Sequence, residues 1–119
     1  MDRSRIFVSN LLYGVLTDKI SVLQALSMYP KNYGDDKSLD VAFHALVHLE
    51  ADEDLRKRDP LYLEEQNDYI EMIAQTLKTG DSLPRNIIAE YEELYPETLV
   101  YKKDTQENVI KRLLKKINL

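Results

Sequence analysis

Apolar residues recur every three or four positions along most of the chain, the spacing that places them on one face of an α-helix. In the densest stretch, from Leu39 to Leu49, they cover nearly the whole circumference of a helix. A helix that is apolar all round is a membrane span or the centre of a core, and this run has about half of the roughly 20 residues that a span needs. The pattern predicts a buried central helix over about residues 38–57, capped by Ser38, with other helices packed around it.

Residues 3–30 are predicted to form two helices. An apolar helical stripe covers residues 3–16 and predicts the first. The hydroxyl of Thr17 can cap free backbone N–H groups, and Asp18 suits the first turn of a helix. We therefore expect the second helix to start at Thr17 and to end at Pro30, where a polar loop begins.

Three helices are predicted after the central one. Asp59 supplies a capping carboxylate, and Pro60 suits the first helical position because its missing N–H costs nothing there. This helix is expected to end at Gly80, since glycine readily adopts the left-handed backbone found after a helix C-terminus. A shorter helix is expected over residues 85–94, and a last one starts at the capping signal of Asp104.

The composition agrees with helices joined by short turns and limits the function. The chain has 119 residues, of which 31% are charged and 44% apolar, with three Gly and four Pro. This length fits one domain, and we expect residues 1–119 to form a single-domain, all-α bundle of about five to six helices. Without cysteine there is no disulfide and no Cys-ligated zinc. Since no apolar run has membrane length and no signal peptide is apparent, we expect a cytoplasmic protein without a membrane partner.

The charge is distributed unevenly along the chain. The net charge is −5, yet residues 102–119 contain six Lys and Arg against two Asp and Glu. The acidic remainder is a poor surface for DNA or RNA, so a nucleic acid is not the partner that we expect. The alternative of a small nucleic-acid-binding regulator depends on the basic C-terminal helix. Its cations, which could equally contact an acidic protein or a second copy, are candidate interface residues: Lys111, Arg112, Lys115 and Lys116.

Both histidines of the chain lie four residues apart on the predicted central helix. Asp40, His44, His48 and Asp52 follow one another at this spacing and stack on successive turns. Two imidazoles so placed can share a metal ion, and a carboxylate one turn on can add an oxygen ligand. His44, His48 and Asp52 are therefore candidate ligands of a divalent metal. Because the row drifts around the helix by about 40° per step, histidines hydrogen-bonded within the core are the competing interpretation.

Two acidic pairs form a second candidate metal site. Glu50 and Glu53 lie towards the end of the central helix, and Glu65 and Asp68 lie in the next long helix. The pairs resemble the ExxE and ExxD motifs of the MazG-type nucleotide pyrophosphohydrolases over residues 50–68. The resemblance implies an all-α, metal-dependent hydrolase of phosphorylated small molecules, with Mg²⁺ held against the phosphates. The apolar face of their helix, however, predicts that Glu65 and Asp68 point outward, away from the first pair.

The C-terminal third also has a group of tyrosines separated by glutamates. Tyr91, Tyr95 and Tyr101 are candidate interface residues, because tyrosine is enriched at protein interfaces, although it is common at the edge of a core as well. No nucleophilic triad, Gly-rich phosphate loop or dinucleotide motif is present. We therefore expect a non-enzymatic helical module that acts through contacts with a partner protein or with a second copy. We expect this module to need no cofactor. A divalent metal ion is expected only in the alternatives, in which one of the two candidate metal sites is occupied.

Overall fold

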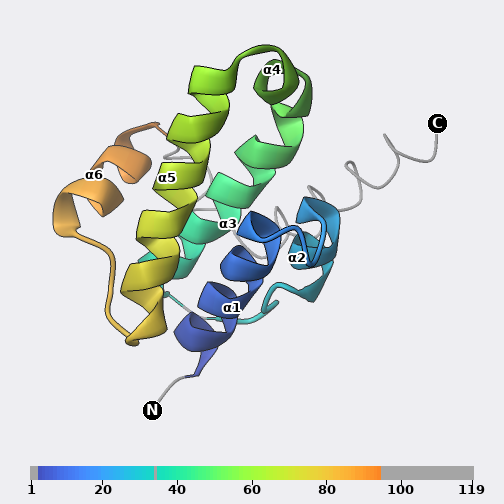
Figure 1. The fold of residues 1–119 in the computed structure, drawn as a ribbon. Coiled ribbons are helices and arrows are strands. Elements are labelled where there is room, and N and C mark those ends of the chain that lie inside the picture. The colour runs from blue at the N-terminus through green and yellow to red at the C-terminus, as the bar shows by residue number, and fades with distance from the viewer. Residues whose placement is uncertain (1–2, 34, 95–119) are drawn as a thin grey trace.

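The computed structural model describes residues 3–33 and 35–94, which form α-helices and no strand (Figure 1). The helices are α1 (Ser4–Leu16), α2 (Val22–Met28), α3 (Lys37–Ala51), α4 (Glu53–Arg58), α5 (Pro60–Lys78) and α6 (Arg85–Leu94). The predicted all-α bundle is confirmed. The last predicted helix lies outside the described residues.

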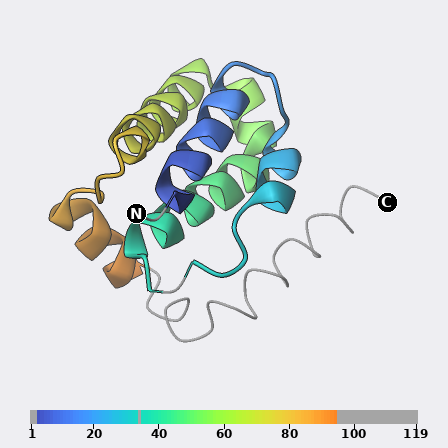
Figure 2. The ribbon, with the colours of Figure 1, turned by 90° about the horizontal axis from the view of Figure 1, so that it is seen from below.

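Helix α3 is the centre of the bundle. It contacts all five other helices, and its apolar side chains at Leu39, Ala42 and Leu46 are inaccessible to solvent. Helices α2 and α6 lie on opposite sides of the bundle in both views (Figures 1 and 2). Because neighbouring helices cover α3 from more than one side, the all-round apolar pattern of its sequence is explained by burial in the core.

The predicted extent of the central helix is wrong at its C-terminal end. Helix α3 stops at Ala51, and after Asp52 the chain continues as the short helix α4. Helix α4 buries none of its residues, so no core contact keeps it in line with α3. The Asp52 carboxylate accepts a hydrogen bond of 2.6 Å from the Tyr62 hydroxyl on α5, which ties the junction to the neighbouring helix.

The predicted cap of the second helix, Thr17, is also wrong. The hydroxyl of Thr17 donates to the carbonyl of Tyr13 and so completes the end of α1. Asp18 then adopts a left-handed backbone with φ 58°, which no helix continues through. The cap of α2 is Ser21, whose hydroxyl accepts from the backbone N–H of Gln24 while the Gln24 side chain accepts from Ser21 in return. This reciprocal pair is a capping box.

The cap of α3 is Asp36 in place of Ser38. Its carboxylate accepts from the backbone N–H groups of Ser38 and Leu39, and it also forms an ion pair of 2.9 Å with Arg5 of α1. Aspartate is as good a cap as serine, and the ion pair adds a contact to another helix. Ser38 is buried inside the first turn, where its side chain accepts a hydrogen bond of 2.8 Å from the backbone N–H of Leu83.

Helix α5 has the ends that its sequence predicts. The Asp59 carboxylate accepts from the backbone N–H groups of Leu61 and Tyr62, and Pro60 occupies the first turn. Past the C-terminal end, Gly80 has φ 82°. Helix α5 packs against α1, where the hydroxyl of the buried Ser9 donates to a carbonyl of α5 at 2.7 Å. In the described part of the chain, none of the helices has the length and apolar character needed to cross a membrane.

Candidate functional site

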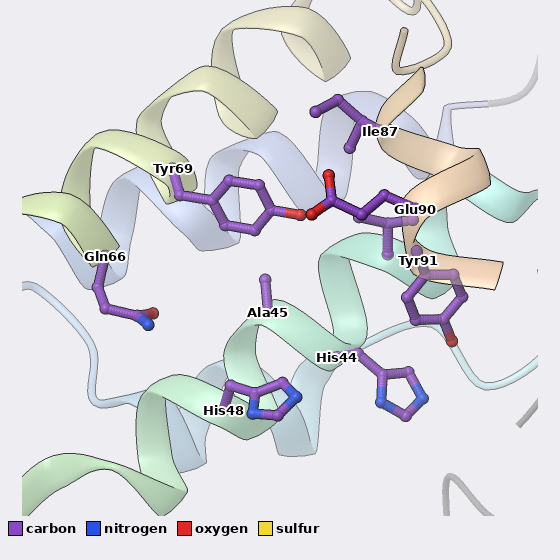
Figure 3. Close-up of a pocket in the computed structure, with 9 residues that line it drawn as sticks. His44, Ala45, His48, Gln66, Tyr69, Ile87, Glu90 and Tyr91 are labelled. Carbon is purple, nitrogen blue, oxygen red and sulfur yellow. The ribbon is translucent and has the colours of Figure 1, made fainter. Parts of the chain in front are cut away.

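A pocket of about 280 Å³ opens where α3, α5 and α6 meet (Figure 3). Its wall combines apolar, aromatic and polar side chains from the three helices. The lining residues are Val41, His44, Ala45 and His48 from α3, Gln66 and Tyr69 from α5, and Ile87, Glu90 and Tyr91 from α6. Both histidines of the protein are therefore in the wall of one pocket.

Several contacts fix α6, which carries one wall of this pocket, against α3. The Leu83 N–H bond to Ser38 fixes the loop before α6 to the first turn of α3. Lys37, also in that turn, forms an ion pair of 2.8 Å with Glu92 of α6. Tyr91 is 6% exposed, and its ring centroid lies 5.3 Å from that of His44. These contacts hold one side of α6 against α3, and Gln66 and Tyr69 of α5 complete the lining.

The imidazole of His44 is electrically neutral at pH 7. Burial, and to a lesser extent the neighbouring His48, lower the pKa of His44 from 6.5 to about 4, because both effects disfavour a charged ring. A neutral imidazole has one N–H donor and one nitrogen acceptor. His44 therefore adds a polar ring to the pocket wall without a positive charge.

The rim of the pocket between α5 and α6 is polar and accessible. Tyr69 is 38% exposed, and Glu90 is also an exposed residue. In Figure 3 the hydroxyl end of Tyr69 and the carboxylate of Glu90 point towards one another across the opening, and Gln66 lies one turn before Tyr69 on α5.

The candidate metal ligands are only partly brought together. His44 and His48 share the pocket, whereas Asp52 lies at the junction of α3 and α4 and accepts the hydrogen bond from Tyr62. Asp40 is buried among the residues at the start of α3, where it accepts a hydrogen bond from the Tyr33 hydroxyl. Within the described ranges, no group of three or more His, Cys, Asp or Glu is placed to hold a metal ion.

The two acidic pairs are separated in the structure. Glu50 and Glu53 line a second pocket of about 490 Å³, which α1, α2, α4 and α5 also border. Glu53 forms an ion pair of 3.2 Å with Lys57 on the same helix. Glu65 and Asp68 are exposed on α5, as the helical pattern predicts, and line neither pocket. The four carboxylates that the MazG-type motif requires are thus distributed over two surfaces.

The tyrosines and cations predicted for an interface are mostly beyond the described residues. Tyr95, Tyr101, Lys111, Arg112, Lys115 and Lys116 all lie outside them. Tyr91 is described, and it belongs to the buried core and to the pocket wall.

Sequence reasoning missed Gln66, Tyr69, Ile87 and Glu90 as pocket residues. Helical spacing places Gln66 with Tyr69 on one side of α5, and Ile87 with Glu90 on one side of α6. The helical spacing therefore groups these residues in pairs, but it does not predict that the two helix faces meet over α3.

Comparisons with known proteins give no relative for this chain: no protein-family model, no curated protein and no solved structure matches it.

Proposed function

We propose that this protein is a non-enzymatic binding module that recognises a protein partner, or a second copy of itself, at the α3/α5/α6 pocket. The observation that carries the proposal is the composition of the pocket: aromatic rings and apolar side chains form its wall, and a few polar groups surround its opening. Binding sites commonly have this composition, because apolar surface supplies affinity and a small number of polar groups fixes orientation.

The partly exposed Tyr69 is the expected contact residue at the rim. Tyrosine is frequent among the residues that dominate binding energy, since its ring buries a large area while its hydroxyl keeps a hydrogen-bond partner. Beside it, the pocket of about 280 Å³ is large enough to admit one side chain of a partner. A partner segment laid over Tyr69 and Glu90 with one side chain inserted is the arrangement that we expect.

The hydrolase hypothesis has less support from the positions of its residues. It needs Glu50, Glu53, Glu65 and Asp68 around one Mg²⁺, but the first two line the second pocket and the others are exposed on α5. The nucleic-acid hypothesis depends on cations outside the described residues.

Site-specific photo-crosslinking of the full-length chain in its native cells tests the proposed function. A benzophenone amino acid replaces Tyr69 in one variant and, as a matched control, the exposed Gln75 on the same helix in another. We expect an adduct of defined mass from position 69 that position 75 does not give. An Ala45→Met variant, which fills part of the pocket, should reduce the adduct while circular dichroism confirms an unchanged helix content.

The purified chain, crosslinked in the same way, distinguishes the two kinds of partner. A dimer-sized adduct from position 69 identifies a second copy as the partner, and an adduct found only in cells identifies another protein, which mass spectrometry names. No adduct from position 69, or equal adducts from positions 69 and 75, overturns the proposal that this pocket is the binding surface.

A further inference from the structure

The charge of the α3/α5/α6 pocket restricts what it can bind. Of its nine described lining residues none is Lys or Arg, and Glu90 has the sole carboxylate. Phosphate or carboxylate ligands normally need cationic partners, and none of these nine described residues provides one. The opening thus favours a positive group over a negative one.

The electrostatic surroundings of Glu90 differ from those of its neighbour on α6. Glu92 is paired with Lys37 at 2.8 Å, whereas Glu90 forms no ion pair with any residue in the described ranges. Next to the pocket residues of α5, Glu65 and Asp68 are exposed carboxylates. A cation approaching the opening is therefore attracted by several negative charges, and among the described lining residues Glu90 is the one that carries such a charge.

Two aromatic rings add a second kind of cation recognition. Tyr69 extends from α5 to the opening beside Glu90, and the ring of Tyr91 lies deeper, against His44 (Figure 3). The face of an aromatic ring attracts an ammonium or guanidinium group placed over it. The side-chain carbonyl of Gln66, which also lines the pocket, can accept an N–H hydrogen bond from such a group.

The size of the pocket limits the ligand to a small group. Its volume of about 280 Å³ lies just below the roughly 300–1,000 Å³ typical of sites for drug-sized ligands. An alkyl chain of a few carbons that ends in a charged nitrogen fits this space. The apolar lining residues Val41, Ala45 and Ile87 can contact its methylene groups, and Glu90 in the same lining can pair with its charged nitrogen.

We infer that the pocket binds an organic cation, an alkyl ammonium or guanidinium group, with Glu90 as its counter-charge and Tyr69 and Tyr91 as its aromatic walls. The inference rests on the proposed function in that the cation is expected to be a lysine or arginine side chain of the partner. A free diamine has the same chemistry and is the other source.

Proton NMR of the full-length chain tests this inference at the site itself. The protein has two histidines, and both line the pocket, so their ring signals report binding there directly. The cationic probes are N-acetyl-lysine methylamide, N-acetyl-arginine methylamide and putrescine. N-acetyl-norleucine methylamide, of similar length but uncharged, and N-acetyl-glutamate methylamide are the controls. We expect saturable shifts with at least one cationic probe and weaker binding of both controls.

The variants Glu90→Gln and Glu93→Gln form a matched pair on α6, because both residues are exposed and only Glu90 lines the pocket. Loss of the Glu90 charge should weaken binding of the cation about tenfold or more, the size of a charge-assisted hydrogen bond, and Glu93→Gln should leave binding unchanged. Thermal unfolding of both variants should match that of the wild type.

Tighter binding of the amino-acid amides assigns the site to a partner's side chain, and tighter binding of putrescine assigns it to a free amine. Equal binding of all probes, no binding of any cation, or no effect of Glu90→Gln overturns the inference. An adduct from position 69 in the crosslinking experiment would then still support a protein partner. Conversely, putrescine binding without any such adduct supports the cation site and argues against the protein partner.

Discussion

The side-chain oxygen of Ser38 and the backbone nitrogen of Leu83 are 2.8 Å apart, and both residues are almost fully buried. Ser38 is in the first turn of α3, and Leu83 precedes α6. This bond crosses 45 residues of sequence and fixes the loop that carries one wall of the pocket. The geometry of the pocket therefore depends on a serine that does not line it.

Ser38→Ala should reduce the free energy of unfolding by about 1–3 kcal/mol, because the buried N–H of Leu83 loses its acceptor. Urea unfolding followed by circular dichroism measures the change. The exposed Ser82, in the same loop, is the matched control, and Ser82→Ala should stay within about 0.5 kcal/mol of the wild type. Equal effects of the two substitutions would contradict a special role of the buried bond.

Leu46→Ala should be among the most destabilising truncations, at about 2–5 kcal/mol, because Leu46 is fully buried at the centre of the bundle and its loss leaves a cavity. Leu61→Ala removes the same atoms from a side chain that is 72% exposed, and it should cost less than about 0.5 kcal/mol. Thermal and urea unfolding of the pair test the assignment of α3 as the core helix. A small effect at Leu46 would refute it.

Asp59→Ala should destabilise the protein by about 1 kcal/mol, because two backbone N–H groups at the start of α5 lose the carboxylate that accepts from them. Asp59→Asn keeps an equivalent acceptor and should retain most of the stability. The comparison of the two variants by urea unfolding separates capping from the general effect of removing a negative charge, since both variants lack that charge.

Stability should fall as the pH decreases from about 6.5 to about 4 because of His44. Its folded-state pKa is lowered to about 4 from an ordinary value of 6.5. The unfolded chain therefore takes up a proton first, and the contribution that is complete above pH 6.5 is lost by pH 4. This difference between the folded and unfolded pKa contributes roughly 2 kcal/mol to the free energy of unfolding, after allowance for the partial exposure of the ring.

His44→Phe keeps an aromatic ring against Tyr91 and cannot titrate. Between pH 7.5 and pH 4, urea unfolding of this variant should therefore lose roughly 2 kcal/mol less stability than that of the wild type. His48→Gln is the control and should retain most of the pH dependence. If His44→Phe has the same pH dependence as the wild type, the buried imidazole is not responsible for it.

Local signals in the sequence determined most of the helices. Asp59 and Pro60 at the start of α5 and Gly80 after its end work through backbone geometry and hydrogen bonds within a few residues, so they act in the same way whatever surrounds the helix. The apolar circumference of α3 likewise predicted its burial, because only a core can accept a helix that is apolar on every side.

Tertiary contacts decided where local signals compete. Asp36 and Ser38 are both good caps in isolation, and the choice of Asp36 comes with its ion pair to Arg5 on another helix. The break at Asp52 accompanies its hydrogen bond to Tyr62 on α5. The pocket depends on such contacts most of all. Helical periodicity places His44, Tyr69 and Glu90 on faces of three separate helices, but only the packing of α5 and α6 against α3 brings those faces around one cavity, because side-chain contacts between distant segments determine how helices cross.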